Sequence, residues 1–349
     1  MSIIEILTPA YEVAWLPWAV QYFFLVGMAA TSTVWVWRCA WSRDPALRRL
    51  EPALMIVLLC SSIAAPVSLL ADLHQPGRFW HFYAHFTPWS WMSLGAILLP
   101  VFVGLSVANV LAWWLDKRAL WRGLSLALLV SAVSILVYSG FEVMVLRSRP
   151  LWNTAFLPVN FALTAALASL GALLLVARFL PGGVAGLPMN YIRRWSLGVV
   201  LSLILVALLW LGSGLMGESR SFAAAQELFQ TYPVWRLGFL GSCALGLLLL
   251  YMLSRPAETL QGTWYSLLCA AFMLGSAWVF RWIIFMAVQG VPKYGAGLYL
   301  YTMPLGSDGL LGMLGVLGLC IALIAASTTL LSLFPARHAP LTAQAAQTH

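Results

Sequence analysis

Nine strongly apolar segments, each roughly 19–27 residues long, occupy almost the whole of this chain. A helix needs about 20 consecutive apolar residues to cross the hydrocarbon core of a bilayer, so every segment is long enough to span a membrane. The composition agrees, because 62% of the 349 residues are apolar and only 9% are charged, far from the averages of soluble domains. The chain is therefore predicted to be a polytopic membrane protein without a soluble domain.

The apolar segments indicate helices rather than barrel strands, because they are long and show no alternating pattern. Their positions predict an all-α fold, a transmembrane bundle of about nine helices. A single integral-membrane domain is expected over residues 1–334, followed by a flexible cytoplasmic tail at 335–349. We place the spans at about 16–41, 53–73, 91–115, 123–146, 159–180, 195–216, 234–254, 263–289 and 310–334.

Basic residues are distributed unequally between the two sides of this arrangement, which predicts its orientation. One side carries Arg38, Arg43, Arg48, Arg49, Lys117, Arg118, Arg122, Arg178, Arg193, Arg194, Arg255 and Arg337, whereas the other carries Arg78, Arg147, Arg149, Arg220 and Lys293. The richer side is expected to be cytoplasmic, with the N-terminus outside and the C-terminus inside. The net charge of +8 then reflects membrane topology, and no nucleic-acid partner is expected.

Histidine and cysteine positions argue against a cofactor bound by this chain. The five cysteines lie singly, without the spacing of an iron–sulfur cluster. No span has a histidine well inside the membrane, so no haem is expected. A zinc site from His74, His81 and His85 has only weak support, since no cysteine or clear carboxylate partner accompanies them. We predict no haem, metal or iron–sulfur cluster in this chain.

Ionisable residues within the apolar segments are the strongest candidates for a functional site. A charge at the centre of the bilayer costs at least about 2.5–3.5 kcal/mol, so Asp72, Glu142 and Arg281 should face the bundle interior. One interpretation is a buried salt bridge of Arg281 with Glu142 or Asp72. The other is a proton-handling pocket of the kind that quinol oxidation requires, because a quinol releases two protons with its two electrons.

Further polar and aromatic residues gather at the predicted outer helix ends. Tyr138 and Glu142 are four residues apart and share one helix face, and Gln21 lies one or two turns inside the first helix. The outer loop at 72–91 is rich in aromatic residues, which are also common anchors at membrane interfaces. A second outer loop at about 217–233 is interpreted as a solvated turn, with a docking surface as the alternative.

Several sequence segments resemble the NrfD/PsrC family, the quinol-interacting membrane subunits of molybdenum oxidoreductases such as polysulfide reductase. Within this family, the segments VPKY (291–294) and PLGSDG (304–309) are most similar to the tetrathionate reductase members. The resemblance runs over essentially all nine spans. Its segments are WLPWAVQYFF (15–24), ADLHQ (71–75), RFWHFY (78–83), TPWSW (87–91), RPLW (149–152) and RW (281–282).

The resemblance implies a complex of three subunits in the bacterial inner membrane. The partners would be a periplasmic ferredoxin-like subunit with iron–sulfur clusters and a catalytic subunit with a molybdopterin centre. This chain would anchor both, oxidise menaquinol or ubiquinol from the quinone pool, and pass electrons to the clusters in anaerobic respiration. The acceptor would be tetrathionate, with polysulfide or another sulfur compound as the alternative.

The resemblance also implies roles for particular residues near the outer ends of the first four helices. His81 and Tyr138 would bond the quinone oxygens, with Gln21 and Asp72 as neighbours. Asp72 or Glu142 would accept protons or orient the ring. Arg149 and Arg281 would stabilise the carboxylates.

Two other classes of protein remain open at this stage. A secondary transporter would also combine many spans with buried ionisable residues, but the chain shows no inverted repeat and no matching pair of broken helices. A passive anchor without a quinol site predicts that replacement of His81 and Tyr138 leaves quinol oxidation intact.

Overall fold

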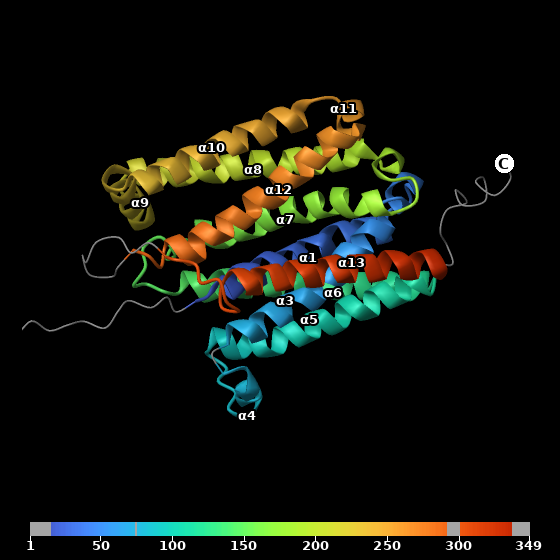
Figure 1. The fold of residues 1–349 in the computed structure, drawn as a ribbon, viewed down its shortest axis with the longest axis horizontal. Helices are drawn as coiled ribbons and strands as arrows, with labels where there is room; N and C mark the ends of the chain where they lie inside the picture. Colours follow the sequence, from blue (N-terminus) through green and yellow to red (C-terminus); the bar gives the residue numbers. More distant parts are fainter. Residues whose placement is uncertain (1–14, 74, 292–300, 337–349) are drawn as a thin grey trace, which may run out of the picture.

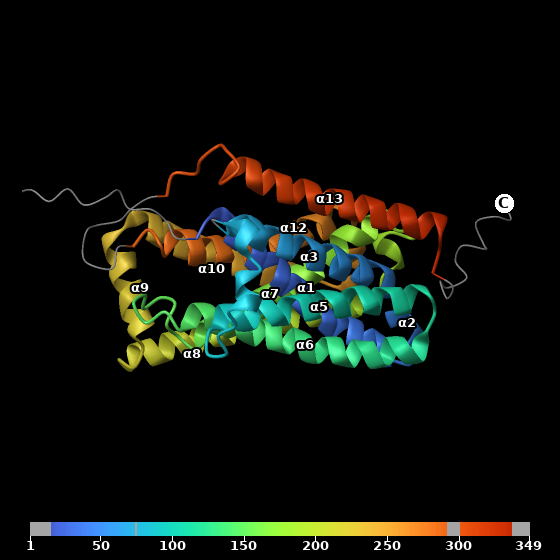
Figure 2. The same cartoon turned by 90° about the horizontal axis from the view of Figure 1, so that it is seen from below.

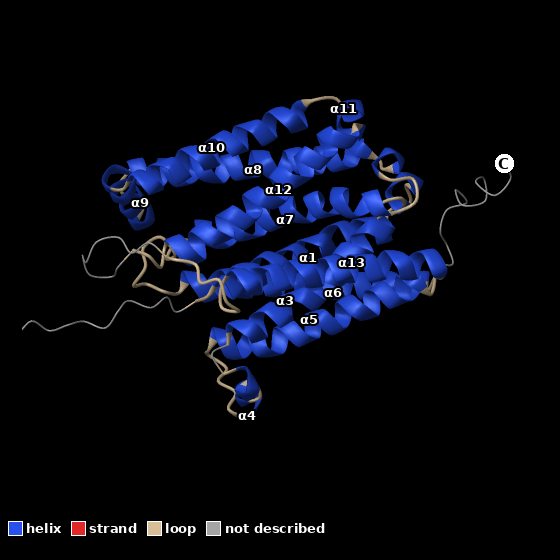
Figure 3. Ribbon diagram, in the orientation of Figure 1, coloured by secondary structure: helices blue, strands red, loops and turns tan. Residues whose placement is uncertain are grey.

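The computed structural model is a bundle of long helices, and it describes residues 15–73, 75–291 and 301–336. No strand occurs in these residues (Figure 3). Nine of their helices are long and apolar enough to cross a membrane, as the sequence predicted. These are α1 (Pro17–Trp41), α3 (Glu51–Asp72), α5 (Trp91–Trp114), α6 (Arg118–Met144), α7 (Phe156–Val176), α8 (Met189–Leu215), α10 (Pro233–Ser254), α12 (Thr263–Trp282) and α13 (Leu310–Leu333).

Helix ends depart from the predicted spans where polar residues continue a helix beyond its apolar part. The structure starts α6 at Arg118 rather than 123, and α8 at Met189 rather than 195. Both helices therefore begin with arginine-containing turns, because a helix does not have to end where the hydrocarbon ends. Proline occupies one of the first positions of α1, α3 and α10, where its missing N–H removes no helical hydrogen bond.

In the described residues four short α-helices connect the long ones: α2 (Pro45–Arg48), α4 (His81–Ala84), α9 (Arg220–Thr231) and α11 (Ala257–Gln261). The interpretation of residues 217–233 as a solvated turn is wrong, because α9 forms there and packs against α8 and α10. Its N-cap is Ser219, whose side chain accepts a hydrogen bond from the Phe222 N–H.

The long helices form two groups, and α1 belongs to the first and contacts the second (Figures 1 and 2). In the first group α1 packs against α3 and α6, α5 packs against α6, and α13 lies along the outside against α3. In the second group α7 packs against α8 and α12, while α10 packs against α8 and α12. Helix α1 also contacts α7 and α12, so it joins the groups. Of the 18-residue apolar stretch of α1, 83% is buried within the protein.

The short helix α4 lies at one side of the bundle, which we call the α4 end, and the opposite side is the α2 end. At the α4 end the chain enters α1, α5 and α7. It also leaves α3 and α6 there. Helix α1 begins and α13 finishes at opposite ends (Figure 1). That the α4 end faces the periplasm stays a prediction from the charge distribution. His74, the first part of the chain to residue 14, and the tail from residue 337 lie outside the described residues.

A buried carboxylate holds three helices together at the α2 end. Glu51 is 2% exposed, and its Oε2 accepts hydrogen bonds from Trp113 Nε1 at 2.8 Å and from Arg118 Nη1 at 3.2 Å. The Arg118 guanidinium also lies 5.0 Å from the Trp121 ring centroid. A buried carboxylate needs such partners to offset the loss of hydration. Glu51 thereby links the start of α3 to the α5–α6 turn.

Candidate functional site

A cluster of buried polar side chains lies at the α4 end of the first helix group. Tyr138 of α6 is 4% exposed and interacts with Tyr22 of α1 and with Glu142, one turn further along α6. The Tyr22 hydroxyl and Glu142 Oε2 are nevertheless buried without a well-formed hydrogen bond to any described group. Native proteins leave few buried polar atoms unpartnered, so this cluster is a candidate ligand site.

Gln21 extends the set of unpartnered groups on α1. Its side chain is buried, and its Nε2 has no hydrogen-bond partner among the described residues. An amide N–H, a phenol and a carboxylate together supply both donors and acceptors. Such a set suits a ligand whose oxygens change between hydroxyl and carbonyl forms.

Asp72, the last residue of α3, adds a third helix to this cluster, beside α1 and α6. Its Oδ1 accepts a hydrogen bond from the Leu16 N–H at 3.1 Å, next to the first turn of α1. It also acts electrostatically on Glu142. The carboxylate thus links the end of α3 to the start of α1 and lies on the same side of the bundle as Glu142.

A glycine of α5 makes room for the Tyr138 phenol. A Cβ atom at Gly95 would overlap the end of the Tyr138 ring. Gly140 of α6 makes room for α7, since a Cβ at Gly140 would lie 2.8 Å from the Pro158 Cα. Close approach of the helices at these glycines holds the phenol in the interior.

His81 is not brought to Tyr138. It is the first residue of α4, an exposed side chain in a segment that projects from the bundle (Figure 1). Its ring packs edge-on against Trp80, with centroids 4.0 Å apart, and against His85 at 5.8 Å. Contact of His81 with a quinone oxygen therefore stays a prediction that this structure does not support geometrically.

Arg281 is buried but forms no ion pair with a described carboxylate. It is 1% exposed, with Nη2 donating to the Phe161 carbonyl at 2.7 Å and Nη1 donating to Thr164 Oγ1 at 2.5 Å. Its guanidinium carbon lies 4.3 Å from the Phe161 ring centroid. The expected salt bridge with Glu142 or Asp72 does not form between these described residues, because Arg281 points toward α7 rather than toward α3 and α6.

Arg149 connects the α6–α7 loop to the end of the α12 segment. Its Nη1 donates to the carbonyls of Val288 at 2.9 Å and Val291 at 3.2 Å. Nearby, Trp152 Nε1 donates to the Ile284 carbonyl at 2.8 Å. Ile284 belongs to η4 (Ile283–Ala287), a π-helical turn that continues α12. Trp152 thus bonds a carbonyl within the π-helical turn, and Arg149 bonds carbonyls of the backbone that follows it.

Sequence reasoning missed Tyr22 and Gln289. Tyr22 is uncharged, so the cost of burying a charge did not mark it, although it adjoins Gln21. Gln289 is 1% exposed, and its amide exchanges hydrogen bonds with the Trp15 N–H and carbonyl, each at 3.0 Å. Nothing in the sequence signals that pairing, because its partners are backbone atoms 274 positions away.

No group of three or more histidine, cysteine or acidic residues in the described ranges is arranged to hold a metal ion. The cluster around Tyr138 is built from hydrogen-bonding side chains. Its position at one end of a membrane bundle, beside an apolar interior, suits a lipid-soluble ligand with polar oxygens on its ring.

These features define a multi-pass helical membrane protein with a buried polar site at one end of its first helix group. Residues 7–293 match the family described as "Polysulphide reductase, NrfD". The chain belongs to the NrfD family.

Two relatives agree with this assignment. The chain is 34% identical over 329 residues to the C subunit of tetrathionate reductase from Salmonella typhimurium, a match that covers 92% of this chain and 93% of the relative. It is 28% identical over 266 residues to protein NrfD of Escherichia coli, covering 67% of this chain and 82% of that protein.

Proposed function

We propose that this chain is the membrane anchor and quinol-oxidising subunit of a tetrathionate reductase complex. The observation that carries the proposal is the set of buried, unpartnered polar atoms around Tyr138. A quinol oxidised there would give a hydroxyl proton to the Glu142 carboxylate and its electrons to the partner subunit, while the two phenols would hydrogen-bond its ring oxygens within the same cluster.

The proposed roles follow from position. Tyr138 bonds one ring oxygen, Glu142 accepts a proton, and Asp72 holds the start of α1 in place beside them. Gln21 offers an N–H to a quinone carbonyl. Arg281 and Arg149 act at a distance. Arg281 ties α12 to α7, and Arg149 ties the α6–α7 loop to the backbone that follows the π-helical turn.

The partners are proposed from the likeness to the tetrathionate reductase relative. An iron–sulfur subunit would dock at the α4 end and receive the electrons, and a molybdopterin subunit would reduce tetrathionate. The bilayer would be the bacterial inner membrane, with the α4 end on its periplasmic face. A polysulfide or other sulfur-compound reductase of the same family is the alternative complex.

The test is quinol-analogue oxidation with tetrathionate as acceptor, in membranes that contain the whole complex. Tyr138→Phe removes one hydroxyl and keeps the ring, and we expect quinol turnover to fall about tenfold, the upper end for loss of one neutral hydrogen bond. Tyr251→Phe is the matched control, because Tyr251 lies at the α2 end of α10 beside Arg255.

Tetrathionate reduction driven by a reduced dye bypasses the quinol site and should be unchanged in both variants. Unaltered quinol oxidation in Tyr138→Phe and in Glu142→Gln would refute the proposed site. His81→Ala belongs to the same series: a loss of turnover would mean that α4 folds onto the cluster in the complex, and no loss would remove His81 from the site.

A further inference from the structure

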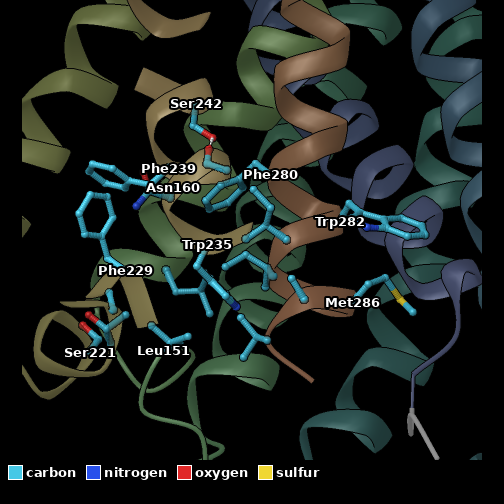
Figure 4. Close-up of a pocket in the computed structure, with 18 of the residues that line it drawn as sticks. Leu151, Asn160, Ser221, Phe229, Trp235, Phe239, Ser242, Phe280, Trp282 and Met286 are labelled. Atoms are coloured by element: carbon cyan, nitrogen blue, oxygen red, sulfur yellow. Dashed lines mark hydrogen bonds between the residues drawn. The ribbon is translucent and has the colours of Figure 1, made fainter. Parts of the chain in front are cut away.

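The second helix group contains a cavity of about 540 Å³ that includes none of the sequence-predicted site residues. It lies at the α4 end, between the start of α7, the α9–α10 corner and the π-helical turn η4. Figure 4 shows aromatic side chains around it, among them Phe229, Trp235 and Phe239 of α9 and α10, and Phe280 of α12. Its volume is within the range of about 300–1,000 Å³ that small-molecule sites occupy.

The few polar groups of the cavity wall are neutral and open to a ligand. The Asn160 amide lies beside the Phe239 ring (Figure 4), and neither it nor the Trp235 indole N–H bonds to another described residue. The Ser242 hydroxyl donates to the Gly238 carbonyl at 2.8 Å, which leaves its lone pairs free to accept. The wall therefore offers two kinds of N–H donor to an acceptor oxygen.

Among the described residues, no charged side chain lines this cavity. Arg236 of α10 does not line the cavity; its guanidinium lies 5.6 Å from the ring centroid of the lining residue Phe229 and donates to the carbonyls of Phe229 and Gln230, each at 3.2 Å. A phosphate head group would require a cationic partner in such a low-dielectric place. The electrostatics thus favour a neutral ring with carbonyl oxygens over a phospholipid head group.

The cavity also borders the apolar outer surface of α10. Val234 and Phe239 line it and are 58% and 51% exposed, on a helix whose outward face meets lipid in a membrane. A ligand ring could thus lie among the aromatic side chains while an apolar tail leaves sideways into the bilayer. Aromatic pairs of this kind favour a planar ring as the ligand.

We propose that this cavity binds the ring of a lipid-soluble quinone, at a site separate from the Tyr138 cluster. The proposal rests on the proposed function only in taking quinone as a ligand that this membrane supplies. The site binds the quinone ring and takes no part in electron transfer. Four residues of the π-helical turn, Ile283, Ile284, Met286 and Ala287, form part of the wall. Phe285 of the same turn instead stacks on Phe23 of α1, with ring centroids 4.5 Å apart.

The test uses the whole complex in nanodiscs and a short-chain azidoquinone that labels its site on illumination. Gly238 lines the cavity, and a Cβ added there meets no described atom within 4 Å, so Gly238→Leu fills the cavity without displacing the backbone. Gly241→Leu is the matched control, since Gly241 also has open space but is not part of the wall. Peptide mapping locates the label.

We expect label on the α9–α10 peptide around Trp235, lost in Gly238→Leu and retained in Gly241→Leu. Asn160→Leu should weaken this labelling about fivefold, the equilibrium factor for one neutral hydrogen bond. Tyr138→Phe should leave it unchanged, so this site and the proposed quinol-oxidation site are tested separately.

Labelling of the α9–α10 peptide that persists in Gly238→Leu would overturn the inference, as would absence of label there in the unmodified complex. Native mass spectrometry gives a second readout. Loss of a bound phospholipid, but not of quinone, in Gly238→Leu would assign the cavity to a lipid and also overturn it.

Discussion

The Arg281 guanidinium lies 4.3 Å from the centroid of the Phe161 ring and donates to the carbonyl of the same residue at 2.7 Å. One residue of α7 thus supplies both a π face and a backbone acceptor to a buried cation of α12. No carboxylate of the described residues neutralises that cation, so its burial is offset by neutral groups alone.

This arrangement predicts that Arg281→Met is tolerated better than Arg281→Lys. Methionine removes the buried charge, whereas lysine keeps a charge and cannot form the paired contacts of a guanidinium. We expect Arg281→Lys to be the less stable variant by about 2 kcal/mol. Thermal unfolding of the detergent-solubilised complex compares them. A less stable Arg281→Met would mean that the cation itself is required, for example by a partner protein.

The buried Glu51 carboxylate predicts that the cost of removing Arg118 depends on whether residue 51 carries a charge. Arg118→Ala removes a cationic partner, and we expect a loss of roughly 2 kcal/mol, below the usual range for a broken buried pair because Arg118 is 29% exposed. Glu51→Gln in the Arg118→Ala background should recover part of the loss, since a neutral amide needs no cation. Unfolding of the double variant measures this coupling, and strict additivity would contradict it.

Gly95 predicts an effect on activity without loss of folding. The end of the Tyr138 ring occupies the space where a Cβ would stand at Gly95, so Gly95→Ala must displace the phenol. If Tyr138 bonds quinol, turnover should fall at least about tenfold, because small misplacements of reacting groups are costly. A Cβ at Gly104 of the same helix meets no described atom within 4 Å, so Gly104→Ala should be neutral. Equal rates in the two variants would argue against a role for Tyr138.

Asp44 predicts a pH dependence of stability at the α2 end. Its carboxylate accepts hydrogen bonds from the Tyr191 hydroxyl and, at 2.9 Å, from the Ala46 N–H, and these bonds lower the pKa of Asp44 below its usual value. A lowered folded-state pKa adds stability above the unfolded pKa of about 3.9, and that stability is lost as the pH falls through the folded value.

We therefore expect the unmodified protein to be more stable than Asp44→Asn at neutral pH, with the difference shrinking below about pH 4. Asparagine is the suitable replacement because it keeps the N-cap of α2. Melting temperatures of both proteins at several pH values measure the difference. A constant difference across the pH range would show that the Asp44 charge is not involved.

The first helix group could be anticipated in part. The spacing of Tyr138 and Glu142 places both on one face of any helix. Because a charge facing lipid is costly, that face was predicted to point into the bundle. Asp72 followed from the same cost at the end of the preceding span. Tyr22 and Gln289 carry no charge, so no burial penalty distinguished them from ordinary residues of an apolar helix.

The exposed position of His81 and the partners of Arg281 could not be anticipated. A loop of aromatic residues is compatible both with folding over the bundle and with projecting from it, and the sequence contains no feature that distinguishes the two. A buried arginine requires hydrogen-bond acceptors, and carboxylates were the visible candidates, whereas the structure uses a carbonyl and a threonine hydroxyl of α7.

The sequence by itself determined the number of spans, their approximate limits and the family, because a bilayer requires long apolar runs and the family segments lie along most of the chain. Only the tertiary structure decided which apolar faces meet each other and which meet lipid. Hydrocarbon and protein interior select the same side chains, so the cavity beside α10 and the choice of α7 as the partner of Arg281 depend on packing geometry that no local pattern encodes.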